Sequence, residues 1–469
     1  MKKLLIIICF ITISTFEINA TEIIFELSKN QKIEGTFSAD LNQEKSIHLI
    51  LTKNKELKNY QIIPFFMDEN ENTIQLETIS TKKNAHIVSY HLNNSNLIFV
   101  LENNEAKNKQ YYVIGYDLIT KKQLTKTIDK NDDEFIFRLI DKTIIFKKVK
   151  NSIEATEILT ANNIIHRKTE VNNINVEKFN EIFKSKERPQ IINTNEFVKN
   201  GSIEDFQVYF ENNHFIFSKV NSKNYTVNTF TLNSEDYSYQ FKSFKNKELN
   251  DIKDLNIYIH NEKLFSISVN KDDALLKIDN LKDGENLSSF SFLKDLNTLL
   301  NSEILDNFIK QASKKRNKPT VTINVTKENK MSVNIDYVDV KEYNYNYNWW
   351  FHHWMWQQQQ WHMQQMIHQQ MNNLNIPKGF GPNPELYENI ETAKPSKKSI
   401  KFVLNNNYII DKNLSLETKY KDIDRDKYLD PLKENSDLKH ITASFQENSL
   451  RYLYYSKSLK KFFIKTSKL

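Results

Sequence analysis

The segment that decides the fold is Phe215–Leu232, which reads FIFSKVNSKNYTVNTFTL. It begins with the apolar run Phe215-Ile216-Phe217, continues through a polar turn of Asn, Ser and Lys, and ends in a run that alternates apolar and polar residues from Tyr225. A continuous apolar run is typical of a strand buried on both faces, whereas alternation is typical of a strand with one face in solvent. The segment therefore predicts a β-hairpin.

Similar hairpins recur along the chain. Two copies align closely with the first: Ile144-Ile145-Phe146 leads to Ile153–Leu159, and Leu264-Phe265-Ser266 leads to Ala274–Leu281. Looser copies begin at Ile47, Leu97, Val321, Ile400 and Ile441. Most successive copies are separated by roughly 40–50 residues, which is the repeat length of propeller blades.

This recurrence predicts an all-β fold with helical insertions, specifically a β-propeller-like fold of seven or eight blades over residues 21–342 and 399–469. A small sheet cannot bury its apolar faces alone, and neighbouring blades cover them. We expect a strand near Ile23–Leu27 to complete the last sheet of this single domain. Tandem β-sandwich domains are the alternative, because they also contain regular short strands. The 6 glycines are few for tight turns, but Asn also tolerates positive φ.

Two long intervals between hairpins carry helical patterns. One lies near residues 175–186. The other, near residues 292–316, has an apolar stripe at helical spacing formed by Leu293, Leu296, Leu300, Ile304, Phe308 and Ala312. We expect both to be helices inserted between blades.

The N-terminus has the three-part pattern of a secretory signal peptide over residues 1–20. Met1-Lys2-Lys3 is basic, Leu4–Phe16 is apolar but too short to span a bilayer, and Ala20 offers a small residue for cleavage. The only cysteine, Cys9, lies within this segment, so cleavage leaves no thiol for disulfides or catalysis. The pattern predicts an exported bacterial protein of the periplasm, outer surface or medium, with no transmembrane segment after cleavage.

The charge balance argues against nucleic-acid binding. The chain has 65 Lys and Arg against 59 Asp and Glu, a net charge of +6 that is spread along the sequence. Nucleic-acid-binding domains concentrate basic residues in a patch or stripe.

Residues 343–375 break the repeat. All 5 tryptophans lie here, around the run WWFHHWMW at 349–356 and the glutamines that follow it. Few residues oppose a helix, on which Trp350, Trp354 and Trp361 share a stripe opposite a second apolar stripe. We expect this Trp stripe to contact an envelope protein or a glycan. The alternative is a helix packed between blades or a Gln-rich loop. A Pro- and Gly-containing surface loop is expected over 376–398.

Two metal sites are candidates. His362 and Met366, four residues apart on that helix, could share a copper ion, although four ligands cannot converge on one straight helix. The stretch Asp422–Asp430 places carboxylates at positions 1, 3, 5 and 9, namely Asp422, Asp424, Asp426 and Asp430. This spacing resembles the calcium loops of integrin-like propellers, which implies a structural calcium. It departs from them at Lys427, where that family has glycine, and a plain acidic turn is the alternative.

No sequence motif of a known catalytic class occurs, and whether the chain is an enzyme stays open. The leading hypothesis is a non-enzymatic binding or scaffold module of a bacterial envelope. A polysaccharide-active propeller enzyme is the first alternative, because paired carboxylates can come from distant blades. A periplasmic copper-binding protein is the second.

Overall fold

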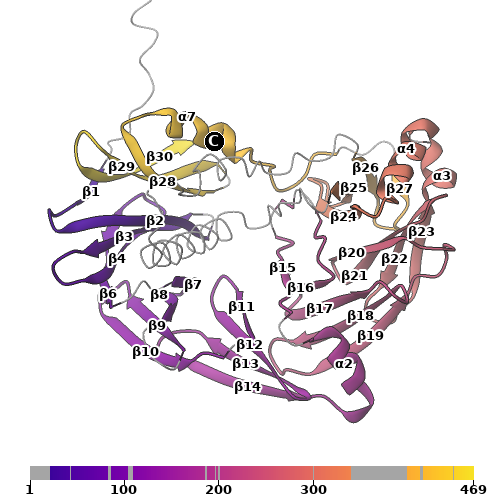
Figure 1. The fold of residues 1–469 in the computed structure, drawn as a ribbon, viewed down its shortest axis with the longest axis horizontal. Coiled ribbons are helices and arrows are strands. Elements are labelled where there is room, and N and C mark those ends of the chain that lie inside the picture. Colours follow the sequence, from indigo (N-terminus) through magenta and orange to yellow (C-terminus); the bar gives the residue numbers. More distant parts are fainter. Residues whose placement is uncertain are drawn as a thin grey trace, which may run out of the picture. The chain divides into compact units, whose positions relative to one another are not determined.

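A computed structural model describes residues 22–42, 44–82, 86–103, 109–131, 133–184, 187–195, 197–198, 201–298, 300–339, 399–411, 416–446 and 448–469. The strands in these ranges form seven sheets of four or five strands (Figure 1). Most of the sheets are meanders of strands consecutive in the sequence, which is the blade pattern of a propeller. The prediction of a β-propeller-like all-β fold is confirmed, with seven sheets described.

The chain divides into two compact units, which we describe separately. The first comprises Met1–Asp129, Thr160–Asn162 and Asp424–Leu469 and contains three sheets and a helix. The first sheet has β1 (Glu22–Glu26), β28 (Leu438–Phe445), β29 (Ser449–Ser456) and β30 (Lys461–Lys468). The second has β2 (Gln31–Asn42), β3 (Lys45–Asn54), β4 (Asn59–Met67), β5 (Thr73–Gln75) and β6 (Ile79–Thr81). The third has β7 (His86–Asn93), β8 (Asn96–Asn103), β9 (Gln110–Asp117) and β10 (Gln123–Asp129), and the helix is α7 (Arg425–Glu434).

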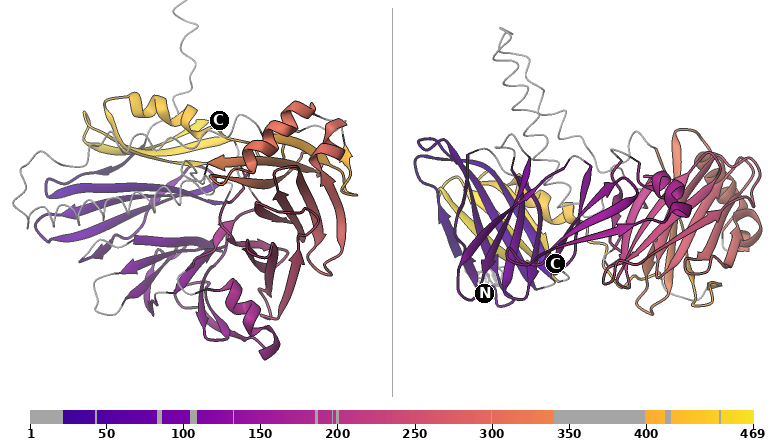
Figure 2. Two further views of the ribbon diagram at one scale, coloured as in Figure 1. Left: turned by 45° about the vertical axis from the view of Figure 1, so that its right-hand side comes forward. Right: turned by 90° about the horizontal axis from the view of Figure 1, so that it is seen from below.

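The second unit comprises Lys130–Leu159 and Asn163–Ile423 and contains four sheets, whose strands Figure 2 shows from two further directions. The first sheet has β11 (Glu134–Arg138), β12 (Thr143–Val149), β13 (Ser152–Ile158) and β14 (Ile164–Glu170). The second has β15 (Gln190–Ile192), β16 (Phe206–Glu211), β17 (His214–Asn221), β18 (Thr226–Asn233) and β19 (Tyr239–Lys245). The third has β20 (Asp254–His260), β21 (Lys263–Val269), β22 (Ala274–Asn280) and β23 (Asn286–Ser291). The fourth has β24 (Asn317–Val325), β25 (Met331–Asp339), β26 (Ile400–Leu404) and β27 (Ile410–Asp411).

The quoted segment forms the central hairpin of its sheet. β17 and β18 pair antiparallel from His214↔Asn233 to Asn221↔Thr226. Phe215, Phe217 and Phe230 are fully buried. Phe215 and Phe217 pack on Phe146 of the neighbouring sheet of this unit, and Phe230 packs on Phe179 of α2. The apolar run therefore forms a strand because both of its faces are covered.

The two hairpins predicted at Val321 and Ile400 belong to one sheet. Val321 lies in β24 and Ile400 in β26, and β25 pairs with both strands. The long interval between these two hairpins is therefore an insertion between neighbouring strands of one sheet. Residues 343–375 and 376–398 both fall in this interval of the sequence, outside the described residues.

The N-terminal strand completes the sheet of the C-terminal strands, as expected. β1 pairs antiparallel with β30, from Glu22↔Ile464 to Glu26↔Lys461. Ile24, Phe25 and Leu27 pack against a buried cluster that includes Phe462.

Apart from α7, the described helices lie in or directly beside the two ranges that the patterns indicate. They are η1 (Asn173–Asn175), α2 (Val176–Ile182), α3 (Phe292–Asp295), η2 (Leu296–Thr298) and α4 (Ser302–Ala312). In α4 the expected stripe residues Phe308 and Ala312 are buried. Leu305 and Ile309 are buried, whereas Ile304 is 49% exposed. No helix in the described part of the chain has the length and apolar character needed to cross a membrane.

Candidate functional site

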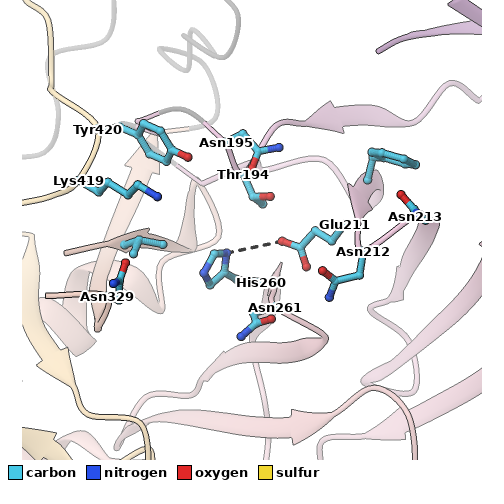
Figure 3. A pocket seen from close by; sticks show the side chains of 12 residues that line it. Thr194, Asn195, Glu211, Asn212, Asn213, His260, Asn261, Asn329, Lys419 and Tyr420 are labelled. Atoms are coloured by element: carbon cyan, nitrogen blue, oxygen red, sulfur yellow. Dashed lines mark ion pairs between the residues drawn. The ribbon is translucent and has the colours of Figure 1, made fainter. Parts of the chain in front are cut away.

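A pocket of about 400 Å³ opens in the second unit, where turns from three consecutive sheets meet (Figure 3). The turns are those between β16 and β17, β20 and β21, and β24 and β25. Its lining consists of Thr194, Asn195, Phe210, Glu211, Asn212, Asn213, His260, Asn261, Val325, Asn329, Lys419 and Tyr420.

The turns place asparagines around the pocket because these residues adopt a left-handed backbone. The φ angles are 47° at Asn212, 60° at Asn213, 48° at Asn261 and 57° at Asn329. Asn tolerates this conformation better than most residues, since its short polar side chain can bond to nearby backbone. Asparagine thus takes the turn positions that glycine often occupies in other proteins, and its carboxamide groups also line this pocket.

Thr194 and Asn195 come from the segment between β15 and β16, which is held tightly against two sheets. The Asn324 side chain accepts from the Val198 N–H at 3.0 Å and donates to the Val198 carbonyl at 2.9 Å. The Asn256 amide donates to the Ser202 carbonyl at 2.7 Å. These bonds to buried polar groups fix the path of the segment beside the pocket.

Lys419 and Tyr420 are anchored to the end of β24. Thr326 and Thr418 form an isolated antiparallel bridge, and the Lys419 N–H donates to the Val325 carbonyl at 2.7 Å. The Thr418 hydroxyl donates to the Tyr420 carbonyl at 2.7 Å. The backbone at this side of the pocket is therefore fixed, while the Lys419 side chain is exposed.

A carboxyl group and an imidazole lie close together at the centre of the pocket. His260 Nδ1 is 3.5 Å from Glu211 Oε1, and the two side chains are only 14% and 8% exposed. The second Glu211 oxygen accepts from the Glu262 N–H at 3.4 Å. Figure 3 shows the carboxylate and the imidazole turned toward each other across the pocket. Glu211 is thus a fixed acceptor with limited access to water.

Several lining side chains have no polar partner among the described residues. Asn212 and Asn213 donate to Glu262 at 3.3 Å and to Glu235 at 3.0 Å. By contrast, six other side chains form no side-chain hydrogen bond or ion pair with any other described residue: Thr194, Asn195, Asn261, Asn329, Lys419 and Tyr420. The Lys419 ammonium lies only over the Tyr420 ring, 5.7 Å from its centre. Such groups are free to bind water or a ligand.

The lining favours recognition of a polar ligand. Carboxamides and hydroxyls both donate and accept hydrogen bonds, and Phe210 and Tyr420 add aromatic faces. Glu211 is the one carboxylate among the lining residues. No group of three or more His, Cys, Asp or Glu that could hold a metal occurs in the ranges described above.

The predicted site residues lie elsewhere. Those of the Trp stripe and the copper pair, Trp350, Trp354, Trp361, His362 and Met366, lie outside the described residues, so their roles stay predictions.

The acidic stretch is helical from Arg425 onward, where a loop was expected. Asp424 caps α7 by accepting from the Lys427 N–H at 3.4 Å, and Asp430 pairs with Lys433 at 3.0 Å. Asp422 belongs to the second unit and Asp424 to the first, and the Asp426 side chain is not described. The two helical contacts fit the alternative of a plain acidic stretch, and calcium binding stays a prediction.

Sequence reasoning did not find the pocket. His260 is one of several histidines scattered among the strand segments of the sequence, and no local motif marks it or any other lining residue. A usable signal was present, because Asn212, Asn261 and Asn329 each occupy the turn after the first long strand of a repeat. Polar residues at equivalent turns of successive repeats converge on one face of the structure.

Comparison with known proteins does not assign this chain to a family. No protein-family model matches the chain, and no curated protein matches it. Among solved structures, the β-propeller domain of the Trilobed protease from Pyrococcus furiosus matches over 93% of this chain and 96% of its own, with 9% identity and a TM-score of 0.34. A variant of the Synechocystis apocarotenoid oxygenase matches over 56% of this chain and 63% of its own, with 8% identity and a TM-score of 0.28. Oligopeptidase B from Leishmania major matches over 67% of this chain and 46% of its own, with 7% identity and a TM-score of 0.28. The chain thus spans less than two thirds of the oxygenase and of the peptidase.

Proposed function

We propose that this chain is an exported, non-enzymatic binding protein of a bacterial envelope, and that the pocket of the second unit holds a saccharide. The observation that carries the proposal is the set of six lining side chains that have no polar partner among the described residues. Thr194 and Tyr420 are half-buried and the other four side chains are exposed at the rim of the pocket, so all six can exchange water for the polar groups of a ligand.

The chemistry of the lining supports a saccharide over an apolar ligand. Each sugar hydroxyl both donates and accepts, and the carboxamides of Asn195, Asn261 and Asn329 can do both in return. The Tyr420 ring offers a flat apolar face for the C–H side of a sugar ring. A volume of about 400 Å³ is at the lower end of small-molecule sites, which fits one or two sugar units.

The lining also favours binding over hydrolysis. Glycoside hydrolysis generally uses two carboxyl groups on either side of the scissile bond, about 5–10 Å apart. Glu211 is the one carboxylate in the lining, and it is engaged by His260 and the Glu262 N–H. The alternative of a polysaccharide-active enzyme needs a second carboxyl group brought to the site.

Titration of the purified protein with a panel of soluble oligosaccharides tests the proposal. We expect binding that falls at least ~10-fold in the double variant Asn261→Gly/Asn329→Gly, because two carboxamides are lost while glycine keeps the positive φ of both turns. Asn94→Gly, at an exposed turn of the first unit with φ 53°, is the matched control and should bind as the unmodified chain does. Failure to bind any member of the panel contradicts the saccharide assignment. Release of new reducing ends that disappears in Glu211→Gln contradicts the non-enzymatic assignment.

The export and the second contact surface rest on sequence alone. The signal-peptide pattern over residues 1–20 supports export, and Trp350, Trp354 and Trp361 remain the proposed contact for an envelope protein. Deleting residues 343–375 should abolish that contact and leave pocket binding intact. Elemental analysis of natively purified full-length and deleted protein tests the copper alternative at His362 and Met366, and it also detects calcium.

A further inference from the structure

We propose that the pocket selects saccharides that carry a carboxylate, the uronic-acid class, and that Lys419 is the residue that recognises the carboxylate. The inference rests on the proposed saccharide function and adds the charge of the ligand to it. The inference is based on the charges of the pocket. On one side lies Lys419, which pairs with no carboxylate among the described residues, and on the other lies the carboxyl group of Glu211.

Lys419 is the uncompensated cation. Its exposed ammonium forms no ion pair with any carboxylate in the described ranges and lies over the Tyr420 ring. The neighbouring Lys327 is different, because Glu417 pairs with it at 2.5 Å. The Lys419 backbone is anchored to Val325, so its side chain is directed from a fixed point, and Figure 3 shows it extending toward the pocket.

The other side of the pocket disfavours a second anion. Glu211 is only 8% exposed and carries its negative charge beside His260, while the Glu262 N–H holds its second oxygen. In Figure 3, Lys419 and Glu211 lie on opposite sides of His260. A carboxylate is therefore attracted to Lys419 and repelled near Glu211, which instead accepts from hydroxyls.

This arrangement fixes the orientation of a uronate. Its carboxylate faces Lys419 and Tyr420, and its ring hydroxyls face Glu211 and the carboxamides of Asn261 and Asn329. A neutral sugar can form the hydroxyl contacts but leaves the ammonium without an anion. Hydrogen bonds between charged groups contribute more than neutral ones, so we expect roughly 10-fold or greater preference for the acid.

Calorimetric titration with matched ligands tests the inference. The probes are short oligomers of galacturonic and glucuronic acid, the same oligomers as methyl esters, and the corresponding neutral oligomers. The unmodified protein should bind at least one acid ~10-fold more tightly than its ester. Lys419→Met should remove that preference while retaining the weaker binding of the ester and the neutral oligomer. Lys401→Met, an exposed β26 residue outside the pocket, removes the same charge and should change neither affinity.

The outcomes separate the two proposals. Equal affinity for acid and ester, or a preference that persists in Lys419→Met, overturns this inference and leaves saccharide binding in place. Loss of preference in both lysine variants also overturns it, because the effect then reflects overall charge. Absence of binding to every acid, ester and neutral oligomer overturns the saccharide function itself.

Discussion

His48 in β3 shows how one buried residue makes stability depend on pH. Its ring is fully buried, with Nδ1 2.8 Å from Ser38 Oγ and Nε2 3.1 Å from Ser46 Oγ. Burial, and secondly the charge of Arg451, lower the pKa of His48 from 6.5 to about 3. The unfolded chain therefore binds a proton below pH 6.5 that the folded chain does not take up until about pH 3. Stability is lost as the pH falls through this window.

The His48→Gln variant tests this pH dependence. Between pH 7 and pH 4 the His48 contribution to the free energy of unfolding should fall by about 3 kcal/mol. Urea titrations at both pH values should show this decrease in the unmodified protein and a correspondingly smaller decrease in the variant. His166→Gln, an exposed residue of β14, is the control. If His48→Gln and the unmodified protein lose equal stability, His48 is not the source.

At the scale of elements, substitution of Gly201 tests how closely the segment between β15 and β16 packs against β24. A Cβ at this position would run into the backbone carbonyl oxygen of Val321 in β24. We expect Gly201→Ala to cost about 1–3 kcal/mol of stability, since backbone must move to relieve the clash. Saccharide affinity should also fall, because the same segment carries Thr194 and Asn195. Gly35→Ala in β2 meets no atom within 4 Å and should be nearly neutral in urea titrations. Equal stability of the two variants would contradict the close packing.

The central strands could be predicted from sequence because burial on both faces leaves an apolar run. The outer strands could not be predicted in this way. β10, for example, is almost wholly exposed, and its sequence contains no continuous apolar run. The count of hairpins was uncertain for a different reason. β24 and β26 each contain an apolar run, so in the sequence each looks like the start of a separate hairpin. Only the pairing of both strands with β25 shows that they belong to one sheet.

Most of the site could not be predicted from the sequence because tertiary structure assembles it, and only the equivalent turn positions of Asn212, Asn261 and Asn329 gave a signal. Glu211, His260 and Asn329 lie on three different sheets, and nothing local in the chain marks them as neighbours. The turn asparagines look like ordinary turn residues, and only the stacking of repeats brings them together. By contrast, the pairing of the N-terminal strand with the last sheet could be predicted, because a repeat fold needs its end sheets completed.

At the scale of the whole molecule, the two ends of the chain depend on each other through β1 and β30. Without β1, β30 becomes an exposed edge, and the cluster under Ile24, Phe25 and Leu27 opens to water. The test compares the free energy of unfolding of a chain that begins at residue 22 with that of a chain that begins at residue 28 and therefore lacks β1. Loss of the strand's hydrogen bonds and of three apolar contacts should cost on the order of 4 kcal/mol in urea unfolding followed by far-ultraviolet circular dichroism.

The variant Phe25→Ala separates the effect of side-chain packing from that of strand pairing. It keeps the backbone hydrogen bonds between β1 and β30 but removes the Phe25 ring, whose centre lies 6.4 Å from that of the Phe462 ring. We expect it to lose a part of the stability that the truncation loses, since Phe25 is only half-buried. The exposed edge should also make the truncated chain associate as its concentration rises, which sedimentation velocity measures. A truncated chain that is monomeric and as stable as the longer one would show that the last sheet is complete with β28, β29 and β30 alone.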